Sequence, residues 1–143
     1  MLHDVDYRAQ ADFRYAMRRF LRVSEENARA TGMTPQQHML LLIVRGHPSY
    51  PAVNITEIAE HLQLRHHSAS LLVDRAVNRG LLHREQDPTD RRRALVSVTS
   101  EGQEKLDHIT SANRRTMSDL SRSLGRLRTS LGQAGDTGAA STA

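Results

Sequence analysis

The chain has 143 residues, of which 38% are hydrophobic and 25% are charged, a size and composition that fit one globular domain. It contains no cysteine, which excludes disulfides, thiolate metal sites and thiol catalysis. Aromatic residues make up 3% of the chain, too few for a stacking surface that binds single-stranded nucleic acid. The formal net charge of +4 permits binding to nucleic acid without demonstrating it.

Hydrophobic runs are short, and the longest, residues 39–44, is far below the length of a membrane span. The first residues lack the hydrophobic stretch of a secretory signal peptide. We therefore expect a soluble, cytoplasmic protein with no membrane partner. The sequence shows no nucleophile elbow, zinc-protease motif or glycine-rich phosphate loop, so it supports neither an enzyme nor a cofactor.

Two helical patterns open the chain. From residue 5 to about residue 30 there is no proline or glycine, and hydrophobic residues recur at spacings of three and four, which predicts an amphipathic helix. Thr34, Pro35 and Gln37 then supply a capping residue, a proline in the first turn and a capping-box glutamine. This second helix continues through residues 39–44, and because it is hydrophobic on nearly all sides we expect it to be central and buried.

The middle of the chain predicts two short helices joined by a turn. Asn54 and Glu57 form a capping pattern that starts the first of them, and a break at residues 63–65 separates it from the second. Gly80 follows at the position where a left-handed glycine commonly ends a helix, with Leu81 as the hydrophobic residue that closes the cap. This arrangement fits a helix-turn-helix.

Two β-strands are expected next, over residues 81–85 and 94–99. The intervening residues 87–93 contain proline, aspartates and three consecutive arginines, which indicates a polar turn. A helix-turn-helix followed directly by a β-hairpin is a winged helix. We therefore predict a mainly α-helical fold with a small β-hairpin wing, flanked by N- and C-terminal helices.

After Thr99, the predicted N-cap, a hydrophobic stripe continues to residue 131. Its spacing is typical of a helix that pairs with another long helix, with an irregularity at Asn113 where it can divide into two helices. We interpret the stripe as a dimer seam, and a terminal helix folded on its own core is the alternative. Residues 132–143, rich in glycine and small polar residues, are expected to form a disordered tail. The stripe consists of Leu106, Ile109, Asn113, Met117, Leu120, Leu124, Leu127 and Leu131.

The segment 90–99 resembles the wing signature of the MarR-type transcriptional regulators, D-x-R-x-x-x-V-x-L-T. The matching positions are Asp90, Arg92, Val96 and Thr99. Val98 stands where the family has leucine. Further stretches look like the same family in the same order, so the resemblance covers about residues 5–131. These stretches are 34–42, 58–62, 72–75 and 79–81.

The resemblance implies a single MarR-like domain over residues 1–131. Residues 5–31 and 100–131 would be dimerisation helices around a DNA-binding part at 34–99. It implies a homodimer on a near-palindromic operator in double-stranded DNA, with the recognition helix in the major groove and the wing in the minor groove. Such regulators are usually repressors that a small aromatic or phenolic ligand releases. A winged-helix module that binds protein and a metal-responsive family member are the alternatives.

The predicted wing tip carries Arg91, Arg92 and Arg93, which suit the narrow minor groove of DNA; a solvated basic turn is the plainer interpretation. The resemblance also implies that Arg92 pairs with Asp74 of the recognition helix. That pair would fix the wing and leave Arg91 or Arg93 to reach DNA. Asp74 and Asp90 are thus expected to hold the wing in place.

The start of the recognition helix offers amides, hydroxyls and side chains that bind phosphate or guanine; plain solvent exposure is the alternative. Arg65 stands where the family often has a capping serine, and an arginine cannot cap the helix. The adjacent pair His66 and His67 is poorly placed to chelate one metal ion, because neighbouring helical residues point about 100° apart. The candidate DNA contacts here are Arg65, His66, His67, Ser68, Ser70 and Arg75.

His38 falls where the family places its ligand pocket, although a core histidine with a satisfied hydrogen bond is the more ordinary interpretation. A zinc site that combines His38 with His3, Asp4 or His108 is a further alternative, and no spacing among them is diagnostic.

Net charge does not identify the DNA-binding part. Residues 54–104 hold seven arginines against eight acidic residues, so this half is not basic overall. Within it, Arg79 and Arg84 are interpreted as surface charges as readily as DNA contacts. The evidence for DNA binding is therefore the placement of three arginines on one predicted hairpin tip.

Overall fold

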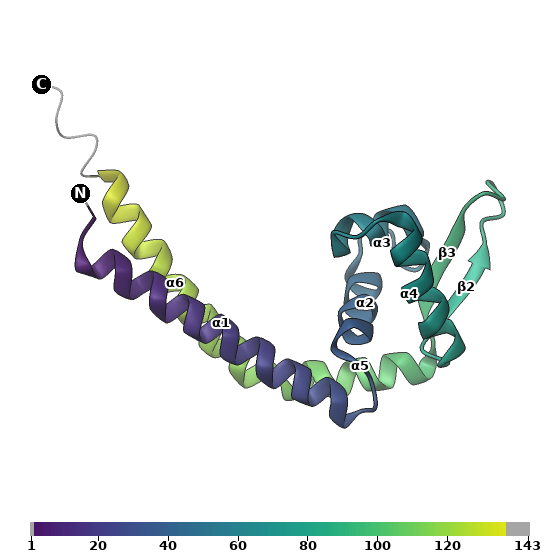
Figure 1. Ribbon diagram of the computed structural model, residues 1–143, viewed down its shortest axis with the longest axis horizontal. Coiled ribbons are helices and arrows are strands. Elements are labelled where there is room, and N and C mark those ends of the chain that lie inside the picture. The colour runs from purple at the N-terminus through teal and green to yellow at the C-terminus, as the bar shows by residue number, and fades with distance from the viewer. Residues whose placement is uncertain (1, 137–143) are drawn as a thin grey trace, which may run out of the picture. The chain divides into compact units, whose positions relative to one another are not determined.

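The computed structural model describes residues 2–136, and the chain divides into two compact units (Figure 1). One unit is formed by the terminal segments, up to Asn27 and from Ser111 onward, and the other is Ala28–Thr110. None of the helices in the described part of the chain has the length and hydrophobicity to cross a membrane.

The terminal unit consists of α1 (Asp4–Ala30) and α6 (Arg114–Asp136), which lie side by side (Figure 1). Hydrogen bonds at both ends show that the two helices are antiparallel. Ser130 Oγ donates to Asp6 Oδ1 at 2.9 Å, and Asn113 Nδ2 donates to Ser24 Oγ at 2.9 Å. The predicted N-terminal helix is thus confirmed, and its contact with α6 includes buried polar side chains beside half-buried hydrophobic ones such as Phe20 and Leu127. The buried polar residues of the α6 segment are Asn113, Thr116, Ser123 and Ser130.

The C-terminal helix divides at Asn113, as the irregularity in the stripe indicated. Before it lies α5 (Ser100–Ala112), and Thr99 caps this helix because its Oγ1 accepts the Gly102 N–H at 3.0 Å. The predicted tail starts too early, since α6 continues through residues 132–136. Each glycine there costs about 1 kcal/mol relative to alanine, but extending an existing helix adds one hydrogen bond per residue. The rest of the predicted tail, 137–143, lies outside the described residues.

The second unit is a winged helix-turn-helix. Its elements besides α5 are α2 (Pro35–Gly46), β1 (Val53–Asn54), α3 (Ile55–Leu62), α4 (His66–Asn78), β2 (Leu82–Gln86) and β3 (Ala94–Val98). The capping box of α2 is complete, with the Thr34 side chain and the Gln37 backbone N–H 3.1 Å apart. Gly80 is left-handed at φ +73°, and the Leu81 N–H reaches Ala76 O at 2.9 Å, which confirms the predicted end of α4.

The wing is part of a three-stranded antiparallel sheet in the order β1-β3-β2. The register pairs Arg84 with Val96 and Gln86 with Ala94, so the hairpin tip consists of residues 87–93, between Gln86 and Ala94. The strand β1 was not predicted. It has two residues, which is too short to show the alternation by which strands are found in a sequence.

The hydrophobic core joins α2 to the helix-turn-helix and the sheet. Leu40 and Leu41 of α2 are fully buried in one cluster with Ile58, Val73 and Val96. The expectation that α2 is buried on nearly all sides is wrong, because Met39 and Leu42 are 41% and 42% exposed. The elements that pack on α2 in this unit, α3, α4 and β3, leave that part of its surface open.

Candidate nucleic-acid interface

A groove of about 480 Å³ lies between the wing and the first residues of α3 and α4. Thr56 and His66 line the helical side, whereas Arg84 and the three tip arginines line the wing side, with Glu85 as the acidic residue among them. Helix N-termini and guanidinium groups both favour anions. The groove therefore brings the predicted wing arginines together with the predicted recognition helix around one cationic surface.

Hydrogen bonds within the turn hold the wing tip in shape. Asp87 Oδ1 accepts the Thr89 N–H at 2.9 Å, and this bond lowers the pKa of the Asp87 carboxyl. Asp90 Oδ1 accepts the Arg92 N–H at 3.0 Å, while Asp90 Oδ2 lies 3.7 Å from Arg93 Nε. Asp90 thus contacts two of the three tip arginines, Arg92 and Arg93, in keeping with a structural role in the wing.

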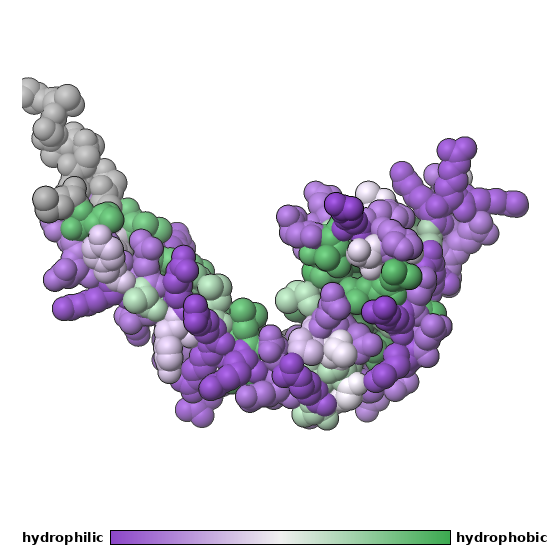
Figure 2. All heavy atoms as spheres, in the orientation of Figure 1, coloured by the Kyte–Doolittle hydropathy of each residue, from purple (hydrophilic) through white to green (hydrophobic). Residues whose placement is uncertain are grey.

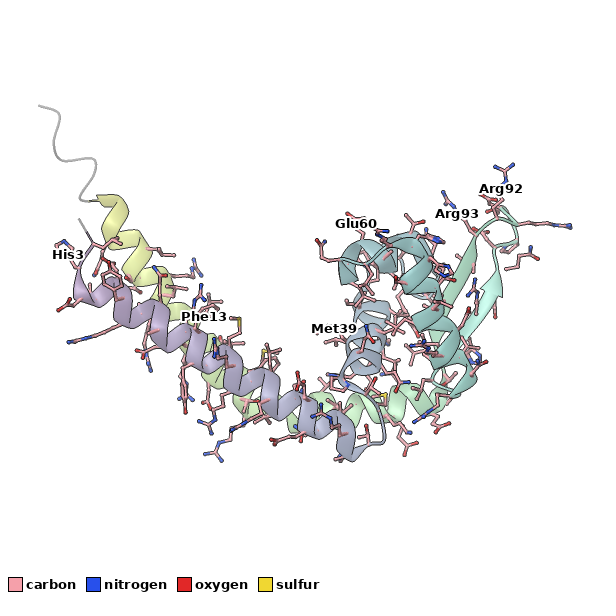
Figure 3. All side chains as sticks on the ribbon, in the orientation of Figure 1. His3, Phe13, Met39, Glu60, Arg92 and Arg93 are labelled. Atoms are coloured by element: carbon pink, nitrogen blue, oxygen red, sulfur yellow. The ribbon has the colours of Figure 1, made fainter. Side chains whose placement is uncertain are left out.

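The three tip arginines differ in their partners. All three are exposed, and Arg93 pairs with Asp90. The side chains of Arg91 and Arg92 form no ion pair with any described residue. Arg92 extends outward from the end of the hairpin (Figure 3), and the wing tip is hydrophilic on the face seen in Figure 2. Two unpaired guanidinium groups are therefore available for an external anion.

The expected pair between Arg92 and Asp74 is wrong. Asp74 Oδ1 pairs with Nη1 of Arg84 on β2, and the same Nη1 lies 3.5 Å from Ser70 Oγ. Leu82 is buried, and Arg84, two residues further along the strand, lies on the same side of it, toward α4. The sequence leaves Arg84 open as a surface charge or a DNA contact, and its two-residue spacing from Leu82 is the signal that could identify it as a partner of α4.

The first turn of α4 lacks a side-chain cap. Arg65 occupies the N-cap position and makes no capping hydrogen bond, as expected for an arginine. His66, His67 and Ser68 are exposed beside these uncapped backbone N–H groups. Of the remaining candidate contacts, Arg75 is exposed, whereas Ser70 is half-buried near Arg84. Most of the predicted recognition residues are thus accessible to a large ligand.

His38 is buried at 6% exposure, and burial lowers the pKa of its imidazole. Its ring has no hydrogen-bond partner among the described residues, so the expected satisfied hydrogen bond is not observed. Within residues 2–136 there is no group of three histidine or acidic side chains that could hold a metal ion. No such group within that range therefore includes His38.

The groove also contains residues that the sequence did not single out as contacts. Asn54 and Thr56 lie on its helical side, at the start of α3. Asn54 Oδ1 caps α3 by accepting the Glu57 N–H at 2.9 Å. The capping pattern was visible in the sequence, but its position opposite the wing depends on the sheet that β1 forms with β3.

A winged helix-turn-helix with a basic wing beside the recognition helix defines a class of DNA-binding transcription regulators. A family model described as "MarR family" matches residues 31–93. The HTH-type transcriptional repressor MdtR of Bacillus subtilis (strain 168) is 26% identical over 117 residues, which cover 82% of this chain and 71% of MdtR. The HTH-type transcriptional regulator YkoM of the same strain is 32% identical over 107 residues, which cover 71% of this chain and 66% of YkoM.

The fold is also found among solved structures. A mutant of MarR from E. coli, complexed with operator DNA, is similar with a TM-score of 0.67 at 18% identity, over 85% of this chain and 89% of that one. The chain belongs to the MarR family of winged-helix transcriptional regulators. Proteins of this family regulate transcription and are not enzymes.

Proposed function

We propose that this regulator is a homodimeric repressor that acts in the cytoplasm on a near-palindromic operator and is released by a small aromatic or phenolic ligand. The observation that carries the DNA-binding part is the cationic groove, which places the wing arginines beside the start of α4. The name of the relative MdtR, a transcriptional repressor, supports repression.

The DNA contacts follow from the two sides of the groove. The start of α4 enters the major groove, where its amides, His66 and His67 meet phosphate and base edges. The wing reaches the adjacent minor groove, where the negative potential attracts Arg91 and Arg92. The wing arginines make the rival interpretation, a winged helix that binds protein, the weaker one.

The proposed dimer is supported by the surface of the terminal unit. Met17 and Leu21 of α1 lie one turn apart, and Met117, Leu124 and Leu131 of α6 are spaced by seven, so each set occupies one face of its helix. These side chains are 37–59% exposed. Met17 and Leu131 line one groove of about 360 Å³, which places both faces on the same side of the pair.

In a unit of only two helices, exposure of this apolar face to water is unfavourable. Figure 2 shows hydrophobic residues along the α1 and α6 pair, whose inner contact is rich in polar side chains. A second copy of the same pair would bury the apolar side chains and complete the core of the terminal unit. The proposed homodimer thus uses the exposed part of the predicted stripe.

The proposed ligand site includes His38. Its buried ring lacks a protein partner, and burial favours its neutral form by lowering the pKa. A neutral imidazole has one donor and one acceptor nitrogen, which suit the hydroxyl of a phenol or aromatic acid. The aromatic class itself comes from the family resemblance.

The test is binding of the full chain to DNA fragments that span its own promoter, titrated with salt. We expect saturable, sequence-selective binding whose log K falls linearly with log salt, by about 0.9 for each phosphate contact. Replacing Arg91 and Arg93 together by alanine should weaken binding and leave the dimer intact, as measured by light scattering. A coding-region fragment of equal length serves as the control.

Equal affinity for the promoter and control fragments would show that the protein does not recognise this promoter specifically, and it would favour the protein-binding alternative. Unchanged affinity in the double alanine variant would contradict the wing assignment. If aromatic acids and phenols leave the bound promoter in place at saturating concentrations, the ligand part of the proposal fails.

A further inference from the structure

We propose that Arg84 on β2 positions the wing against the recognition helix by pairing with Asp74, which leaves Arg92 free for the DNA contact proposed above. The inference rests on the proposed DNA-binding function and assigns separate roles to two arginines within it. It differs from what the wing signature implies, because there the arginine at the position of Arg92 makes the contact with the helix.

Arg84 connects two turns of α4 to the wing. Its Nη1 pairs with Asp74 Oδ1 and lies 3.5 Å from Ser70 Oγ. Ser70 and Asp74 are four residues apart and therefore lie on the same face of the helix. The side chains of Arg84 and Asp74 are 34% and 50% exposed, so the pair is partly shielded from solvent. These contacts fix the angle between β2 and α4.

The strand register keeps Arg92 away from Asp74. Arg84 pairs with Val96, whereas Ala94 pairs with Gln86, two residues nearer the tip. Those two residues move the chain about 7 Å outward, and Arg92 precedes Ala94 in the turn. The backbone of Arg92 is held by Asp90, and its side chain extends from the tip (Figure 3).

Because Arg84 and not Arg92 pairs with Asp74, the positive charge of Arg92 stays available at the wing tip. An unpaired Asp74 on the recognition helix would repel phosphate, and Arg84 neutralises it from the body of the wing. The tip therefore does not contribute an arginine to that task. Arg91 and Arg92 both remain unpaired among the described residues, so the wing tip can neutralise more phosphate.

A double-mutant cycle tests the positioning role. The proteins are wild type, R84Q, D74N and the R84Q/D74N double variant, with R84K as the conservative replacement. R79Q is the matched control, since Arg79 is another arginine of this unit with one protein partner, Gly32 O at 3.1 Å. Promoter affinity is measured by fluorescence anisotropy at five salt concentrations, and the free energy of unfolding by urea titration without DNA.

We expect R84Q to weaken operator binding about two- to fivefold, the size of a partly exposed ion pair, with an unchanged salt slope. In the D74N background the same replacement should have no further effect, and R84K should restore part of the affinity. R79Q should bind like wild type. The urea titrations should show the same coupling between positions 74 and 84 without DNA.

The role of Arg92 has a separate signature. R92Q should weaken binding and reduce the salt slope by about 0.9, the loss of one phosphate contact, while the free energy of unfolding stays unchanged. An R84Q variant with a reduced slope, and an equal effect in the D74N background, would show that Arg84 contacts DNA and would overturn the positioning role.

An unchanged slope in R92Q would overturn the second part of the inference. If wild type itself shows no selective binding, the proposed function fails, and Arg92 loses its assigned role with it. The urea cycle then decides about Arg84 alone, since absence of coupling would also overturn its contact with Asp74.

Discussion

Asp90 uses its two carboxylate oxygens for different neighbours in the wing tip. Oδ1 accepts the backbone N–H of Arg92, and Oδ2 lies 3.7 Å from the guanidinium of Arg93. An exposed pair of this kind contributes under about 1 kcal/mol, so Arg93 can exchange Asp90 for a phosphate at low cost. Three adjacent arginines of identical chemistry therefore differ in availability because of the partner that each one meets.

His38 gives a residue-scale prediction about pH. Burial lowers the pKa of this imidazole from its usual 6.5, so the unfolded chain binds a proton at a higher pH than the folded protein. The free energy of unfolding should therefore fall as the pH drops below 6.5, by at most about 1.4 kcal/mol per pH unit.

Urea unfolding of wild type and H38Q at several pH values between about 5 and 8 measures this contribution. We expect the curve of H38Q to be flatter, because glutamine does not titrate. Parallel curves for the two proteins would show that His38 takes up its proton equally in the folded and unfolded states.

The start of α5 depends on the end of α4 and on the sheet. Thr99 Oγ1 donates to Gly80 O at 2.6 Å and accepts the Gly102 N–H at 3.0 Å, so one side chain joins the cap of α5 to the end of α4. Gly102 lies directly against the backbone of Leu81, where a Cβ would be 2.3 Å from the carbonyl oxygen. A residue without a side chain is needed at this contact.

Replacing Gly102 by alanine should therefore destabilise the protein by about 1–3 kcal/mol, the usual cost of overpacking, because a backbone carbonyl cannot turn aside. The measurement is urea unfolding. Gly125 is the matched control, since it lies in α6 with no atom within 4 Å of its added Cβ. There the same replacement should stabilise by up to about 1 kcal/mol, through helix propensity alone. A G102A variant as stable as wild type would contradict the close contact.

At the scale of the whole molecule, charge is distributed contrary to the simplest expectation for a DNA-binding protein. Residues 28–110, which contain the winged helix, hold ten basic and nine acidic residues, whereas the terminal segments hold ten and seven. The proposed DNA affinity of the winged helix must then come from the local arrangement of the wing arginines and not from the net charge of that unit.

The proposed dimer predicts a molecule-scale effect of one substitution in α6. L124E places a charge on the exposed apolar face, and burying that charge in a dimer would cost several kcal/mol. We expect a shift from dimer to monomer in analytical ultracentrifugation, together with loss of operator binding. R126E is the matched control, because Arg126 lines a different groove with Asp12 and Tyr15.

Circular dichroism of the same samples reports whether the monomer keeps its helices. A dimer of unchanged stability in L124E would mean that the apolar face is not the interface. A monomer in R126E instead would move the interface to the other groove of the helix pair.

Local motifs explain which features could be predicted from the sequence. The capping box at Thr34, the left-handed Gly80 and the cap at Thr99 are each closed by hydrogen bonds to residues at most five positions away. Asn113 likewise marked the division between α5 and α6. Such contacts form between neighbours in the chain, so their residue types and spacing are enough to place the helices and the wing.

Other features depend on residues that are distant in the chain. The hairpin carries arginines both on β2 and in its tip, and the strand register brings Arg84, not Arg92, to Asp74. The predicted stripe likewise separates, with Leu106 and Ile109 in the core of the winged helix and Leu124 exposed on α6. Periodicity gives the face of a helix but not what packs against it, since that is a property of the folded chain. The net charge of +4 likewise does not predict the DNA-binding surface, because the attraction of phosphate depends on the positions of the arginines in the folded protein.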